Sequence, residues 1–140
     1  MKRTRLKQKT RLKKQSKSLI AKLKRELTPL FREYIRRRDK DICQKCGKRV
    51  VGRNSHPSHV LPKKTYKSLE WDEDNVKLLC WHCHNFFWHL SPTESMVWFI
   101  EKFPSRWLAL QYKKNRTIQV SEIELQAMID YYKDELSKIS

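Results

Sequence analysis

All four cysteines of the 140-residue chain fall in two short pairs, Cys43 with Cys46 and Cys80 with Cys83. Structural Zn²⁺ prefers four thiolates in a tetrahedron, and a two-residue spacer lets one turn present two sulfurs to one ion. The pairs therefore predict a closed structural zinc site that joins two distant segments. Two disulfides are the alternative, which the basic, polar N-terminus disfavours because it does not resemble a secretory signal.

Three further residues lie where this zinc site would bring them close together. His59 and Asn75 lie between the two pairs, and His84 directly follows the last cysteine. Histidine can accept a proton or bind a metal ion near neutral pH. The region enclosed by the pairs is therefore a candidate active site. A hydrogen-bonded surface histidine and an ordinary turn asparagine are the alternatives for His59 and Asn75.

Short strands and one helix are expected to position these residues. Apolar residues and bracketing prolines predict strands around residues 50–51, 59–61 and 76–79, and then a helix over about residues 80–89. Before the zinc pairs, helical periodicity begins at Ser16, and Thr28 followed by Pro29 predicts the start of a second helix. After them, capping patterns at Ser91 and Ser121 predict further helices.

The predicted fold class is α+β, with a zinc-bound ββα core flanked by N- and C-terminal helices. We expect a disordered basic arm at 1–17, N-terminal helices at 18–41, the zinc-bound core at 42–91 and a C-terminal helical extension at 92–140.

Positive charge is concentrated at the N-terminus. The formal net charge is +17, and residues 1–25 hold twelve Lys/Arg and no acid, whereas the remaining 115 residues hold 20 Lys/Arg and 15 Asp/Glu. Such an arm is typical of a phosphate-binding tail, and a solubilising tail is the alternative. The candidate nucleic-acid contacts are Arg3, Arg5, Lys7, Lys9, Arg11, Lys13 and Lys14, together with Arg36 and Arg37 on the following helix.

Hydropathy disfavours a membrane partner. No apolar run of the sequence approaches the roughly 18 residues of a membrane span. Together with cysteines that are expected to bind zinc and not to form disulfides, this predicts a soluble protein in a reducing, cytoplasm-like compartment.

Residues 34–90 resemble the HNH nucleases, whose core is a ββα-metal finger. The resemblance rests on His59 before Val60-Leu61-Pro62, on Asn75 before a short apolar strand, and on Cys83-His84. Residues 34–39, the segment 69–75 and the order of both cysteine pairs are similar to the phage NinG/Rap recombination nucleases. The C-terminal third contributes little to this resemblance.

The resemblance implies roles for these residues. His59 would be the general base that activates water, and Asn75 would constrain the loop or accept the His59 ring N–H. His84 would bind one catalytic divalent ion, Mg²⁺ or Mn²⁺, beside the structural Zn²⁺ held by the cysteines. The family also implies DNA as the partner and products with 5′-phosphate and 3′-hydroxyl ends.

One position departs from the family pattern. Many HNH proteins have a metal ligand immediately before the base, and this chain has Ser58. His56 and His89 could complete the metal shell instead. On a regular α-helix, however, His84 and His89 would lie about 140° apart, because each residue turns the helix by about 100°.

Three functions agree with this sequence. The first is a metal-dependent DNA endonuclease, with branched recombination intermediates as a substrate that the family resemblance suggests. The second is a non-catalytic zinc-knuckle protein that binds nucleic acid, and the third is a nuclease or binder of RNA. Symmetric cutting of a DNA junction would favour a homodimer, with the C-terminal helices as a possible interface.

Overall fold

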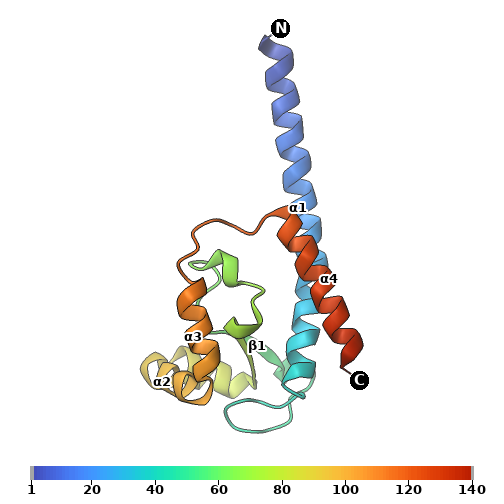
Figure 1. The fold of residues 1–140 in the computed structure, drawn as a ribbon. Helices are drawn as coiled ribbons and strands as arrows, with labels where there is room; N and C mark the ends of the chain where they lie inside the picture. Colours follow the sequence, from blue (N-terminus) through green and yellow to red (C-terminus); the bar gives the residue numbers. More distant parts are fainter. Residues whose placement is uncertain (1, 140) are drawn as a thin grey trace.

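The structure is a computed structural model that describes the backbone of residues 2–139 and the side chains of residues 4–139. It combines helices with one small sheet, which confirms the α+β class. The longest element, α1, spans Lys2–Arg38 and extends well beyond the rest of the protein at its N-terminal end (Figure 1). The side chain of Arg3, one of the candidate phosphate contacts, lies outside the described part.

Helix α1 corrects two expectations. Residues 2–17, expected to be a disordered arm, belong to the helix, and Pro29 lies inside it instead of opening a second helix. The Thr28 hydroxyl donates to the Lys24 carbonyl within the helix. Leu27 and Phe31 are buried on one face across the proline, and this face packs against α4 (Glu122–Lys138). This packing offsets the roughly 3 kcal/mol that an internal proline costs.

The sheet is a single antiparallel pair among the described residues. Strand β1 (His56–His59) pairs with β2 (Val76–Leu79), in a register that places His56 opposite Leu79 and His59 opposite Val76. Strand β2 has the predicted bounds and is fully buried. Strand β1 begins three residues earlier than predicted, and the expected strand near residue 50 is only an isolated bridge between Ile42 and Arg49.

Short helical turns and three helices complete the fold. The turns are η1 (Gly52–Asn54), η2 (Lys67–Leu69) and η3 (Glu73–Asn75). A π-helix, η4 (Cys83–His89), begins at the last cysteine, and α2 (Pro92–Lys102) and α3 (Pro104–Lys113) come after it. Ser121 caps α4 as predicted, since its side chain accepts from the Glu124 N–H. None of the helices in the described part is long and apolar enough to cross a membrane.

Candidate active site and metal sites

The four cysteines converge on one point. Their sulfur atoms all lie within 4.8 Å of one another, and the Cys46 and Cys80 sulfurs are 3.8 Å apart. A tetrahedral zinc with Zn–S bonds of about 2.3 Å requires sulfur separations of about 3.8 Å. The arrangement therefore fits the predicted zinc site. Cys43, Cys80 and Cys83 are buried, and Cys46 is exposed.

A tight turn presents the sulfurs of the first pair, and the start of a helix presents those of the second. Gly47 has φ of +76°, the left-handed conformation that glycine adopts without a Cβ penalty, and its N–H donates to the Cys43 carbonyl. Burial raises the pKa of Cys43, but hydrogen bonds from the backbone N–H groups of Cys46, Cys80 and Lys45 outweigh burial and lower it to about 7. At Cys43 the backbone thus favours a thiolate, the form that binds zinc. Burial raises the pKa values of Cys46 and Cys83 above their ordinary value.

His59 is oriented by a backbone carbonyl. Its Nε2 lies 2.8 Å from the carbonyl oxygen of Glu70. A carbonyl can only accept, so Nε2 carries the proton and Nδ1 retains a lone pair. Burial lowers the pKa of His59 below its ordinary 6.5, although the Glu70 carbonyl opposes this shift. The ring is therefore neutral at neutral pH and able to accept a proton.

Asn75 fastens the loop between the strands. It is fully buried. Its Oδ1 accepts from the Leu61 N–H at 2.8 Å, and its Nδ2 donates to the carbonyls of Leu61 and Leu69 at 3.0 Å each. Of the two roles that the sequence left open, this geometry corresponds to constraint of the loop. The His59 ring N–H is accepted by Glu70 and not by Asn75.

His84 and His89 lie together, contrary to the expectation from a regular helix. Their Nε2 atoms are 3.2 Å apart. The reason is the π-helix η4, whose i→i+5 pattern brings residues five apart onto one face. Two ligands at right angles, each about 2.1 Å from one ion, would be about 3.0 Å apart. The pair therefore fits a shared metal ion.

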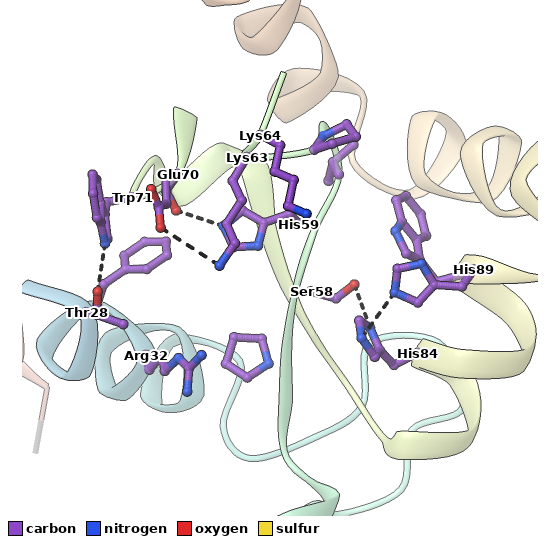
Figure 2. A pocket seen from close by; sticks show the side chains of 15 residues that line it. Thr28, Arg32, Ser58, His59, Lys63, Lys64, Glu70, Trp71, His84 and His89 are labelled. Carbon is purple, nitrogen blue, oxygen red and sulfur yellow. Dashed lines mark hydrogen bonds and ion pairs between the residues drawn. The ribbon is translucent and has the colours of Figure 1, made fainter. Parts of the chain in front are cut away.

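Ser58 orients the His84 ring. The Ser58 hydroxyl lies 3.0 Å from His84 Nδ1, opposite the Nε2 that faces His89 (Figure 2). Burial, with the nearby His89 and His56, lowers the pKa of His84 to about 4. A neutral imidazole is the form that binds metal. Ser58 thus acts on the site through His84.

His56 lies next to this pair. Its ring stacks on the ring of His84, with centroids 5.2 Å apart and planes 13° apart. Its Nε2 is buried and has no hydrogen-bond partner among the described residues. Of the two extra ligands considered from the sequence, the structure brings His89 into direct contact with His84 and places His56 against the His84 face.

A buried lysine lies beneath the site. Lys77 on β2 has no exposed surface, and its Nζ lies 3.1 Å from the Ser58 hydroxyl and 3.3 Å from the His59 carbonyl. The amine also lies over the ring of Trp88. Burial lowers the pKa of Lys77 well below its ordinary value. Lys77 therefore links the backbone of His59 to the hydroxyl that orients His84.

One cleft of about 420 Å³ contains His59, Ser58, His84 and His89 (Figure 2). It opens between α1, β1 and η4. Three basic residues that the sequence reasoning did not select also line it: Arg32, Lys63 and Lys64. The sequence could have indicated two of them as candidate phosphate contacts, since Lys63-Lys64 follows His59 by only four residues.

Arg36 and Arg37, the candidate phosphate contacts on α1, are placed differently. Both pair with Glu33, at 3.0 and 2.8 Å. Neither belongs to the described residues that line the cleft. Their charge is partly neutralised within the helix, so Arg32 is the α1 arginine positioned to meet a substrate in the cleft.

Comparisons with known proteins agree with this site. Residues 43–86 match the model of the HNH endonuclease family. A protein of Lactococcus phage SK1 named "Probable HNH endonuclease" is 36% identical over 59 residues, which cover 39% of this chain and 61% of that protein. This chain thus spans about three fifths of the length of that relative. No solved structure matches the chain. Residues 43–86 are therefore similar to the HNH endonuclease family, and the finer resemblance to the NinG/Rap nucleases stays a prediction.

Proposed function

We propose that this protein is a metal-dependent endonuclease that hydrolyses phosphodiester bonds in DNA, with His59 as the general base. The HNH match and the name of the phage relative support nuclease activity. The observation that carries the assignment of the base is the Glu70 carbonyl on His59 Nε2, because it leaves Nδ1 as the proton acceptor of a residue that lines the cleft.

In the proposed reaction, His59 Nδ1 takes a proton from water and the water oxygen attacks phosphorus. The P–O bond to the 3′-oxygen breaks, and this oxygen takes a proton from solvent. The products are the 5′-phosphate and the 3′-hydroxyl that the family resemblance implies. Arg32 and Lys63 lie in the same cleft and would bind the phosphate oxygens. Asn75 holds the loop that carries the Glu70 carbonyl, so it supports the base indirectly.

His84 and His89 would hold the catalytic ion, with His56 beside them. A divalent cation bound there would stabilise the negative charge on the leaving oxygen. Imidazole nitrogens suit transition metals better than Mg²⁺, which prefers oxygen ligands. Of the two ions expected from the sequence, this donor set favours Mn²⁺.

The test is cleavage of supercoiled plasmid with Mn²⁺, Mg²⁺ or EDTA. We expect His59→Ala to reduce kcat by about 10²- to 10⁴-fold, with zinc content and melting temperature unchanged. His82→Ala is the matched control, because His82 is an exposed histidine outside the cleft. Equal cleavage by wild type and His59→Ala would refute the proposed base. No cleavage with either metal would favour the non-catalytic zinc-knuckle function.

The resemblance to recombination nucleases supports a preference for branched DNA, with a homodimer cutting two strands. A four-way junction and a linear duplex of the same sequence should then differ in kcat/KM. Sedimentation with and without the junction measures the oligomeric state. Equal rates on both substrates, or a monomer throughout, would remove this part of the proposal and leave the nuclease activity intact.

A further inference from the structure

The candidate active-site cleft continues into two further clefts. A second cleft of about 300 Å³ shares Lys63 and Lys64 with the first. A third of about 280 Å³ shares Lys67 and Gln119 with the second. Because neighbouring clefts share residues, the three form one groove that leads away from His59.

Basic side chains dominate this groove. Among the described residues that line it, seven are basic and one is acidic; the basic ones are Arg32, Lys63, Lys64, Lys24, Lys67, Lys114 and Arg116. The acid, Glu70, has a carboxylate oxygen 3.9 Å from the Lys63 amine. Most of these basic side chains are exposed. The groove is therefore a continuous positive path that starts at the active site.

Four of the seven basic residues of the groove lie outside the HNH match of residues 43–86, namely Lys24, Arg32, Lys114 and Arg116. Helix α1 contributes Lys24 and Arg32, two turns apart on one face. The far end is formed by residues 114–120, the connection from α3 to α4 that passes back toward α1 (Figure 1). Three segments that are distant in the sequence thus supply one surface of the same charge.

We propose that this groove binds the backbone of the cleaved DNA on one side of the scissile phosphate. The inference rests on the proposed function and extends it to the binding of the flanking phosphates. Lysine and arginine bind phosphate oxygens without reading the base. Trp71, an aromatic residue of the groove, is only 4% exposed and has no free face for base stacking. The groove therefore supplies affinity and register, with strong salt dependence and no sequence preference.

The variant that tests this carries Lys67→Gln, Lys114→Gln and Arg116→Gln. These residues line the third cleft and not the cleft that contains His59. KM for duplex DNA should rise at least about tenfold with kcat unchanged, because the contacts lie away from the reacting atoms. In a His59→Ala background, the slope of log K against log salt should become shallower by about two to three, since each phosphate contact contributes about 0.9.

The matched control removes three exposed lysines elsewhere: Lys48→Gln, Lys133→Gln and Lys138→Gln. It has the same net charge as the groove variant and should keep the wild-type KM and salt slope. Since Arg116 also pairs with Glu124, the double variant Lys67→Gln/Lys114→Gln keeps that pair and should still show about two thirds of the slope change.

Ethylation interference locates the contact. In wild type, ethylated phosphates on one side of the cut should block binding, and this effect should disappear in the groove variant. Equal changes in the groove and control variants would overturn the proposal, as would weakened binding to duplex RNA with unchanged binding to DNA. If the groove variant cleaves DNA with the wild-type KM, the proposed role of the groove is refuted and the proposed nuclease activity is unaffected. If the wild-type protein binds DNA but never cleaves it, and the groove variant loses this binding, the role of the groove is supported and the nuclease activity is refuted.

Discussion

At the residue scale, the site depends on which nitrogen of each histidine ring carries a proton. The Glu70 carbonyl places the proton of His59 on Nε2. The Ser58 hydroxyl can accept the Nδ1 proton of His84, which leaves the Nε2 lone pair for a metal. A serine at the position of an expected metal ligand therefore contacts the site through the ring of the neighbouring His84.

The lowered pKa of His59 predicts the pH dependence of cleavage. A protonated His59 cannot accept a proton from water, so kcat/KM falls as the pH drops through the pKa of His59. Burial shifts that pKa downward. The acid limb should therefore lie below about pH 6.5, the ordinary value for histidine. Rates measured from about pH 5 to 8 at saturating Mn²⁺ test this. A limb at pH 7 or above would contradict the geometry of a buried, neutral base.

Lys77 is a positioning residue, and Lys77→Met tests this role. Methionine has a similar length and removes the amine that contacts the Ser58 hydroxyl and the His59 carbonyl. We expect Mn²⁺ affinity and cleavage to fall about tenfold, because residues behind a ligand commonly affect a metal site by 10- to 100-fold.

Ser58→Ala is the variant to compare with Lys77→Met, because the Ser58 hydroxyl contacts both the Lys77 amine and the His84 ring. The double variant should lose little more than Ser58→Ala alone. Additive losses in a Mn²⁺ titration would show that Lys77 acts by another route. Unchanged melting temperatures confirm that the fold is retained.

At the element scale, the π-helix η4 determines how the side chains of His84 and His89 lie relative to each other. A regular α-helix would separate His84 and His89 by about 140°, whereas the i→i+5 pattern of η4 brings them together. Such π-bulges are frequent at functional sites. Because each turn of η4 contains about one more residue than a turn of an α-helix, His84 and His89 lie on one face although they are five residues apart.

Changing the spacing tests this directly. Deletion of Phe86, which is 47% exposed, leaves the two histidines four residues apart, about 40° on an α-helix. Mn²⁺ binding should survive this deletion. Insertion of an alanine after Phe86 separates them by six residues, about 120°, and should weaken Mn²⁺ binding by more than about tenfold. Loss of binding in both variants, with zinc content intact, would contradict the π-helix argument.

Helix α1 is the second element with an assigned role. Its described side chains from residue 4 to 18 are all exposed, and basic residues recur at helical neighbour spacings such as Lys9 and Lys13. Like charges four apart destabilise a helix by about 0.2–0.5 kcal/mol per pair. Phosphates would neutralise this repulsion, so the N-terminal part of α1 is suited to follow a DNA backbone as a helix.

Duplex DNA should therefore increase the helical signal of the wild-type protein in far-UV circular dichroism at low salt. A variant without residues 2–17 should show no such increase and a shallower salt dependence of binding. The full-length variant with glutamine at Arg5, Lys9 and Lys13 serves as the second comparison, because it keeps the length of the helix. An unchanged salt slope in both variants would remove the phosphate-binding role of α1.

At the scale of the whole molecule, the C-terminal third supports the site. Glu73 accepts hydrogen bonds from Tyr34 on α1 and Tyr131 on α4. Lys113 at the end of α3 pairs with Asp72 and Asp74. These contacts join three helices to the loop that carries Asn75 and the Glu70 carbonyl. The acidic run at 72–74 therefore joins this loop to the surrounding helices.

Zinc removal should unfold the core. The cysteine cluster joins the segment before β1 to the segment after β2, and zinc binding in small domains is coupled to folding. Chelation, or Cys46→Ser at the exposed ligand, should lower the melting temperature by on the order of 10 °C or more. Added Zn²⁺ should restore the chelated protein, and Mn²⁺ should not. A chelated protein with unchanged melting temperature would show that the cluster is not structural.

The sequence alone determined the features that depend on local spacing. Two CxxC pairs predict a metal cluster because the conformation between two cysteines depends only on neighbouring residues. Strand β2 and the Ser121 cap were also predicted, because they too depend on residues close in the sequence. His59 and His84, two of the residues selected from the sequence, line the same cleft in the structure.

Only the tertiary structure decided the features that depend on packing. The apolar face shared with α4 keeps α1 continuous through Pro29. The π-helix joins His84 to His89, and folding brings the Glu70 carbonyl to His59 and buries Lys77 beneath Ser58. The basic groove combines segments before, within and after the HNH match. Each of these features depends on contacts between residues that are distant in the sequence. A local sequence pattern cannot predict the energies of such contacts.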